Sequence, residues 1–188
     1  MYKIKLRLNS QFFIAFPSIK CIITSWEGDI NMIVKAVGGD IFNSETKHIA
    51  FAINTEGYND SGFAGTVSNS YWKELADCGR NEIGTVLSKK VGDKTFHALV
   101  CHSLNEGWGP NQAEVIRDCF DKIPSNGEEV ATIAIGTGFI GMMTGADFRK
   151  IVCGMYDSKQ KIVLHSCYTL EAIEECYKEE QAKVYKKR

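Results

Sequence analysis

The chain has 188 residues, of which 44% are hydrophobic and 24% are charged, and its formal net charge at pH 7 is −1. This length predicts a single domain that buries a sizeable core. The near-neutral balance lacks the strong basic excess typical of nucleic-acid-binding chains, and no run approaches the ~18 apolar residues of a membrane span. The apolar run at residues 12–16 is also shorter than the ~7–15 residues of a signal-peptide core. We therefore expect a soluble protein that keeps its N-terminus.

Seven cysteines are scattered along the chain, and no two of them form a C-x-x-C pair. The odd number and the irregular spacing indicate neither a disulfide framework nor a zinc site. Several lie in apolar runs, where a free cysteine acts as a small hydrophobe. We expect reduced thiols in a cytoplasmic protein, with no metal and no cofactor.

The N-terminal third begins with short strand patterns. Residues 3–8 alternate basic and apolar side chains, as a half-buried strand does. Residues 12–16 and 19–24 predict two more short strands, and residues 26–31 a polar turn. These strands would extend the N-terminal side of the domain.

From residue 32 onward, strand and helix patterns alternate. Strands are predicted, in chain order, at residues 32–37, 49–53, 84–91, 94–102, 130–135 and 161–165, and helices at 63–78, 112–123, 146–156 and from 170 onward. This alternation predicts a largely parallel sheet covered on both faces. Ligands of such sheets bind at the carboxyl ends of strands, and three glycine-bearing segments follow predicted strands there, at residues 39–42, 54–65 and 136–141.

Residues 136–141 fit the pattern G-x-G-x-x-G between a strand and a helix. Backbone N–H groups in such a turn can bind phosphate, although a tight turn without a ligand fits as well. A dinucleotide-binding Rossmann unit would need an acidic residue ~20 positions later, at the end of the next strand. Asp157 precedes that strand, which ends at His165, and little sequence follows. The pattern therefore disfavours a nicotinamide-dependent oxidoreductase.

Four short motifs in this order resemble those of the macro domain family, over about residues 30–168. They are G-D-I-F at residues 39–42, A-I-N at 52–54, G-F-A-G at 62–65 and A-I-G-T-G-F-I-G at 134–141. The resemblance implies an α/β fold with three α/β/α layers and a mixed, mostly parallel central sheet. The chain would then be one domain, with extra N-terminal strands within residues 1–29 and a charged C-terminal helix at 169–188.

The resemblance also implies that the chain binds ADP-ribose or a derivative. Asp40 would accept a hydrogen bond from the adenine amino group, helped by the Ile41 backbone, unless Asp40 only caps the turn. Asn54 matches the family's first loop asparagine, and Phe139 would pack on the distal ribose, unless it packs in the core. The two phosphate-side loops would be formed by Gly62, Phe63, Ala64 and Gly65, and by Gly136, Thr137, Gly138, Phe139, Ile140 and Gly141.

Two family positions differ in this sequence. The position of the family's second loop asparagine is occupied by Gly57. Glu56, Asn59 or Asp60 could substitute for the missing asparagine. A branch of the family uses a lysine nucleophile, whose position falls near His102, and an acid, whose position falls on Ile140. His102 could act as an acid or base because its pKa lies near neutrality, or it could be a hydrogen-bonded surface residue.

The leading hypothesis is therefore a binding module for ADP-ribose or a related nucleotide, free or carried on an ADP-ribosylated macromolecule. The alternative is an ADP-ribosyl hydrolase that acts on a modified protein, nucleic acid or small molecule. An interaction domain that has lost its ligand is also compatible with these residues.

Overall fold

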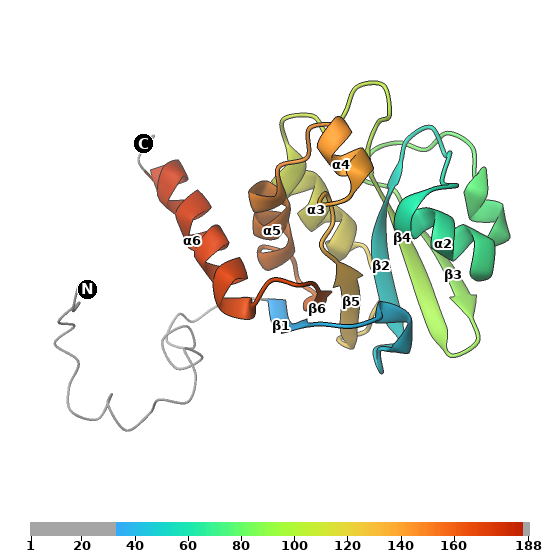
Figure 1. The fold of residues 1–188 in the computed structure, drawn as a ribbon, viewed down its shortest axis with the longest axis horizontal. Helices are drawn as coiled ribbons and strands as arrows, with labels where there is room; N and C mark the ends of the chain where they lie inside the picture. Colours follow the sequence, from blue (N-terminus) through green and yellow to red (C-terminus); the bar gives the residue numbers. More distant parts are fainter. Residues whose placement is uncertain (1–32, 186–188) are drawn as a thin grey trace, which may run out of the picture.

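The computed structural model describes residues 33–185 of the chain, so the strands expected at residues 3–8, 12–16 and 19–24 lie outside the described residues. A six-stranded sheet forms the centre of the fold, with strand order β1-β6-β5-β2-β4-β3 (Figure 1). Only the pair β3–β4 is antiparallel, and the others are parallel. This confirms the mixed, mostly parallel sheet. The strands are β1 (Ile33–Val37), β2 (His48–Asn54), β3 (Val86–Val91), β4 (Lys94–His102), β5 (Glu129–Ile133) and β6 (Lys161–His165).

Helices cover both faces of the sheet and give the three expected layers. They are α2 (Gly62–Ser70), α3 (Gln112–Asp121), α4 (Phe139–Met143), α5 (Phe148–Tyr156) and α6 (Leu170–Tyr185), with 3-10 turns at Ile41–Asn43 and Lys73–Ala76. The helices α3, α5 and α6 pack on one face, and α2 with the second 3-10 turn packs on the other. No helix in the described range 33–185 is long and apolar enough to cross a membrane.

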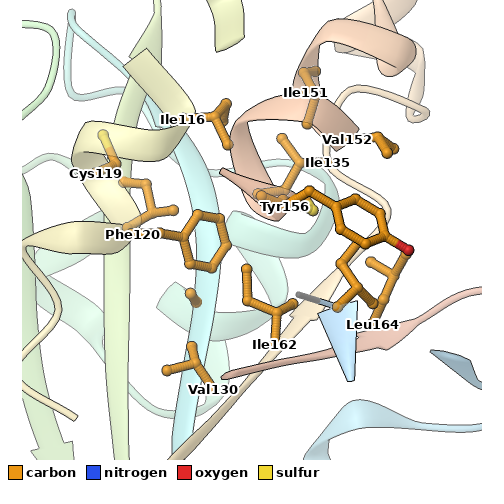
Figure 2. Close-up of a cluster of buried hydrophobic side chains, with 14 of the residues drawn as sticks. Ile116, Cys119, Phe120, Val130, Ile135, Ile151, Val152, Tyr156, Ile162 and Leu164 are labelled. Carbon is orange, nitrogen blue, oxygen red and sulfur yellow. The ribbon is translucent and has the colours of Figure 1, made fainter. Parts of the chain in front are cut away.

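The larger core lies between the sheet and the pair α3 and α5 (Figure 2). Phe120 and Ile116 on α3 meet Ile151 and Tyr156 on α5, and all four are at least 97% buried. The helices approach closely because α5 carries Gly154, where a Cβ atom would collide with the Ala113 carbonyl oxygen of α3.

A smaller core on the opposite face contains Phe51, Val67 and Phe96. At its edge Phe42, which follows β1 in the chain, stacks on Phe63 of α2 with ring centroids 5.2 Å apart and an interplanar angle of 2°. The turn after β1 is thereby held against the start of α2, so two of the sequence motifs lie side by side.

Two helix predictions need correction. The helix expected at residues 63–78 ends at Ser70, because the N–H groups of Tyr71 and Trp72 both donate to the Val67 carbonyl and the chain turns there. The four-residue spacing of Val67, Tyr71 and Leu75 is therefore not one helical face. The segment 136–141, expected to be only a turn, also contains the start of α4.

A chain of polar side chains runs through the buried His97 in the amino-terminal half of the sheet, away from the carboxyl ends. His97 Nδ1 lies 2.8 Å from the Ser88 hydroxyl, His97 Nε2 lies 2.9 Å from His48 Nδ1, and His48 Nε2 lies 3.3 Å from Glu128 Oε2. With both imidazoles neutral, each donor meets one acceptor, because the Glu128 carboxylate can only accept. Burial first, and the charge of His48 second, lower the pKa of His97 to about 4.

This cluster predicts a pH-dependent stability. Below about pH 6.5 the unfolded chain binds a proton on His97 that the folded chain does not bind until about pH 4. The free energy of unfolding should therefore fall as the pH decreases from about 6.5 to about 4. His97→Gln keeps hydrogen-bonding atoms toward Ser88 and His48 and should flatten this slope in denaturant unfolding measured across that range. Lys90→Gln, which changes an exposed residue of β3, is the control. A wild-type slope in His97→Gln would contradict the prediction.

Candidate functional site

A cleft of about 800 Å³ lies at the carboxyl ends of β2, β4, β5 and β6, between the start of α2 and the loop that leads into α4. This is the edge of the sheet at which the sequence predicts a ligand. Of the predicted site residues, the following line it: Asn54, Gly62, Phe63, Ala64, His102, Gly136, Thr137, Gly138, Phe139, Ile140 and Gly141.

A second hollow of about 570 Å³ is lined by residues of β1, β5, β6 and the loop before β2. Its charges largely pair with one another: Lys35 lies 3.2 Å from Glu129, and Lys47 lies 2.9 Å from Glu128. We therefore assign the candidate site to the larger cleft.

The glycine loop folds back on itself, and its glycines make this possible. Gly136 has a φ of +80°, and a Cβ there would lie 2.5 Å from the Ile151 side chain. A Cβ at Gly141 would lie 2.5 Å from the Gly136 carbonyl oxygen, so the two ends of the motif are in backbone contact. A Cβ at Gly138 would meet nothing within 4 Å, because this residue faces open space. Gly136 and Gly141 therefore allow the loop to fold back on itself, and Gly138 leaves the outer surface of the loop free of a side chain.

The other wall is the first turn of α2. The N-terminal cap residue, Ser61, makes no side-chain hydrogen bond to the helix in the described structure. The first N–H groups of a helix have no partner within it, and those of Gly62, Phe63 and Ala64 belong to residues that line the cleft. Gly65 lies behind this wall, against the Asp60 backbone, where a Cβ would come within 2.6 Å.

Asn54 organises the loop after β2. Its Oδ1 accepts hydrogen bonds from the N–H groups of Gly57 (2.8 Å) and Tyr58 (3.1 Å), and its Nδ2 donates to the Tyr58 carbonyl (2.6 Å) and to Asn59 Oδ1 (3.3 Å). Gly57 has a φ of +82° and packs against the Gly79 backbone so closely that any side chain would collide with it. The family's second asparagine therefore has no room at Gly57.

Glu56 clamps the loop after β4. Its carboxylate accepts hydrogen bonds from the Ser103 hydroxyl (2.6 Å), the Leu104 N–H (2.9 Å) and the Asn105 side chain (3.1 Å). Desolvation, the largest single effect, raises the pKa of Glu56, but the hydrogen bonds from Leu104, Ser103 and Thr55 together lower it to about 2. Glu56 is a permanent anion that holds a loop, and it is not among the residues that line the cleft.

The other two candidates for replacing the second asparagine differ from each other. Asn59 is buried, and its side chain accepts from Asn54 and donates to the Leu75 carbonyl at 3.1 Å. Both residues line the cleft, but Asp60 is exposed. Asp60 is thus the better placed of the two for contact with a ligand.

His102 lies in the cleft wall with its ring nitrogens unpaired. Its side chain is stacked on Trp108 with ring centroids 5.0 Å apart, and the residue is only 6% exposed. Within residues 33–185, neither ring nitrogen of His102 has a hydrogen-bond partner, and the Trp108 indole N–H has none either. The expectation of a hydrogen-bonded surface histidine is therefore wrong. Burial lowers the pKa of His102, and the charge of Glu56 partly opposes this.

A register shift between β2 and β4 brings His102 to this position. Ile53 pairs with Val100, but Asn54 pairs with His102, so Cys101 is an extra residue on β4. Bulges of this kind redirect the side chains that follow them. His165, at the end of β6, adds a second imidazole with both nitrogens unpaired among the described groups, and it also lines the cleft.

The cleft has little side-chain charge. Among the described residues that line it, Asp60 is the one acid, and there is no lysine or arginine. An anionic ligand would therefore be bound by backbone N–H groups and by the side chains of Trp108, His102 and His165.

Asp40 and Ile41 do not line the cleft. Asp40 Oδ1 accepts a hydrogen bond from the Phe42 N–H at 3.0 Å and caps the 3-10 turn. Ile41 is buried in the smaller core. The stacking of Phe42 on Phe63 nevertheless keeps this corner next to the cleft wall.

Two further predictions concern single side chains. Phe139 is 75% exposed, so its alternative role in core packing is wrong. Asp157, the acid considered for a Rossmann unit, lies at the end of α5 and accepts a hydrogen bond from the Tyr177 hydroxyl at 2.9 Å. It is not among the residues that line the cleft, which further disfavours the oxidoreductase hypothesis.

Trp108 and the segment 165–168 line the cleft, although neither was among the predicted site residues. Trp108 lies in a loop between Gly107 and Gly109, and a large aromatic residue between two glycines could have marked it. His165 ends a predicted strand of the parallel sheet, so the rule that ligands bind at carboxyl ends applied to it as well.

The glycine contacts predict a contrast between two substitutions. Gly141→Ala places a Cβ against the Gly136 backbone and should lower the free energy of unfolding by about 1–3 kcal/mol. Gly138→Ala meets open space at an extended φ and should change it by less than about 0.5 kcal/mol. Urea denaturation of the two variants measures the difference. Equal stabilities would show that the loop does not close through Gly141.

No protein-family model matches the chain, and no curated protein matches it. Solved structures do match it. A macrodomain of Mycobacterium tuberculosis DarG has a TM-score of 0.52 and 16% identity, over 70% of this chain and 95% of that chain. A macrodomain variant of Oceanobacillus iheyensis with ADPR has a TM-score of 0.54 and 15% identity, over 80% and 92%.

The alphavirus protein P23pro-zbd has a TM-score of 0.56 and 14% identity over 79% of this chain. The chain spans only 23% of the length of that protein. Together with the sheet order and the two loops at its carboxyl edge, these matches show that the chain has the macrodomain fold.

Proposed function

We propose that the chain binds ADP-ribose, or a derivative of it, in the cleft between α2 and the glycine loop. The observation that carries the proposal is the pairing of two glycine-bearing backbone walls, at residues 62–64 and 136–141, across one cleft at the carboxyl ends of the strands. Both walls offer N–H groups at helix starts, which suit a diphosphate.

The buried polar groups support the same proposal. An unpaired buried donor or acceptor costs about 1–3 kcal/mol, and His102, Trp108 and His165 all line this cleft with unpaired nitrogens in the described structure. A ligand rich in hydroxyl and phosphate oxygens would satisfy them. The likeness of the fold to a macrodomain determined with ADPR points to such a ligand.

Titration calorimetry with ADP-ribose, AMP and NAD tests the proposal. We expect ADP-ribose to bind most tightly. Gly138→Val should weaken binding by roughly tenfold or more, equivalent to ~1.4 kcal/mol, because its side chain projects from a loop surface that must lie close to phosphate. Gly38→Val is the control, since a Cβ there also meets nothing within 4 Å and Gly38 does not line the cleft. Absence of ADP-ribose binding at millimolar concentration would refute the proposal.

The same titration tests Asp40 as the residue that recognises adenine. Asp40→Asn can still cap the 3-10 turn through its side-chain oxygen, but its amide group presents donors where a carboxylate only accepts. Binding of ADP-ribose should weaken while the stability stays the same. An unchanged affinity would remove Asp40 from the site.

A specific observation favours a second function, hydrolysis of an ADP-ribosyl adduct. His102 is buried in the cleft wall, its nitrogens are unpaired among the described residues, and its lowered pKa keeps it neutral at pH 7. A neutral imidazole can accept a proton from an attacking water. Its stacking on Trp108 would hold the ring in place.

If the chain is a hydrolase with this base, release of ADP-ribose from an ADP-ribosylated protein should lose at least about tenfold in rate in His102→Gln. The rate of the wild-type protein should rise with pH with a midpoint below about pH 6.5, because burial lowers the pKa of the base. A release rate that His102→Gln leaves unchanged would leave binding as the function.

The proposed partner is thus ADP-ribose, free or attached to a macromolecule. A cytoplasmic location stays part of the proposal, because the six described cysteines are free and such thiols persist in a reducing compartment.

A further inference from the structure

The mouth of the cleft is surrounded by apolar side chains. In the described structure nine large hydrophobic side chains are exposed, and five of them line the cleft: Tyr58, Leu104, Phe139, Ile140 and Tyr168. Two more, Met142 and Met143, follow on the same helix as Phe139. Soluble domains rarely gather exposed apolar groups in this way unless a partner covers them.

Helix α4 carries most of this surface. Phe139 and Met142 are each 75% exposed and Met143 is 68% exposed, while Gly141 is the one buried residue of the helix. The helix is held from behind by the contact of Gly141 with the Gly136 backbone. It therefore presents its large side chains to solvent as a consequence of how the glycine loop closes. We call Phe139, Ile140, Met142 and Met143 the α4 apolar face.

The charge of this region distinguishes between partners. Residues 134–146 contain no charged side chain, and no lysine or arginine is among the described residues that line the cleft. Binding of nucleic acid depends on cationic side chains that neutralise phosphates, and here there are none. Exposed methionine and phenylalanine side chains instead suit apolar groups of a polypeptide, because methionine adapts its shape to varied partners.

Resting on the proposed function, we infer that the adduct which enters the cleft is carried by a polypeptide, and that the α4 apolar face binds apolar side chains next to the modified residue. ADP-ribose would occupy the cleft, and the flanking peptide would leave it over α4. Phe139 and Ile140 belong both to the cleft wall and to this face, so the two surfaces are continuous.

Competition binding with three probes tests this inference: free ADP-ribose, a serine-ADP-ribosylated peptide with leucine and phenylalanine on both sides of the serine, and the same peptide with glutamate and serine there. The apolar peptide should bind roughly tenfold or more tighter than free ADP-ribose, and the polar peptide should not. In the double variant Met142→Gln/Met143→Gln this gain should disappear while the affinity for free ADP-ribose stays the same. Neither methionine lines the cleft, and glutamine has a similar length and helix propensity.

The matched control is Ile83→Gln, which removes an exposed apolar side chain (46%) that does not line the cleft, and which should change nothing. Equal affinities for the two peptides, or a double variant that keeps the gain, would overturn the inference while the proposed function stands. A single-stranded oligonucleotide with a terminal ADP-ribose that binds tighter than the apolar peptide would also overturn it. The inference would also be overturned if the wild-type chain dimerises through this face while the double variant is monomeric. Failure of free ADP-ribose to bind overturns the proposed function, and this inference with it.

Discussion

The site depends on the side chain of Asn54, which is buried at the end of β2 and uses both its oxygen and its nitrogen to hold the following loop. That loop presents Glu56 to the loop after β4, where the carboxylate binds the Ser103 hydroxyl and the Leu104 N–H. The β4 loop in turn carries Trp108, which stacks on His102. One buried amide thus begins a series of contacts that ends at the two aromatic rings of the cleft wall. Hydrogen bonds lower the pKa of Glu56 to about 2, so its carboxylate is ionised at neutral pH and keeps these contacts.

A second constraint is that any ligand of the cleft would be recognised largely by the backbone. Glycine at 136 and 141 allows the loop to touch itself, and glycine at 138 leaves its outer surface free of side chains. Fixed N–H groups bind an anion without the desolvation that buried cationic side chains require. The absence of lysine and arginine from the described lining also means that binding should respond weakly to salt. Selectivity must then come from shape and from hydrogen bonds.

Much of the fold followed from sequence patterns, and the exceptions have physical reasons. β4 and β6 have the predicted bounds because each is a short, largely apolar run with polar or turn residues before it. The helix after residue 62 ends early because the Tyr71 and Trp72 N–H groups share the Val67 carbonyl, and the Ser68 hydroxyl donates to the Gly65 carbonyl within its last turns. Most of the predicted binding residues do line the cleft, but Asp40 serves as a cap. The burial of His102 follows from the extra residue Cys101 in β4, a register shift that no local pattern reveals.

The unpaired nitrogens of His102, Trp108 and His165 bear on why the cleft exists in this form. Each lowers the stability of the folded state, and a core of the same shape built from apolar residues would not carry that cost. Sequences retain such groups at functional sites, where local rules are broken in favour of a ligand. The exposed side chains of α4 break the opposite rule, since they leave apolar surface in water beside the same cleft. The unpaired nitrogens of the cleft and the exposed side chains of α4 lie at one edge of the sheet. At the opposite end the buried His97 pairs with Ser88 and with His48, which in turn lies against Glu128. The contrast between the two ends agrees with the proposed binding of a polar ligand that carries an apolar attachment.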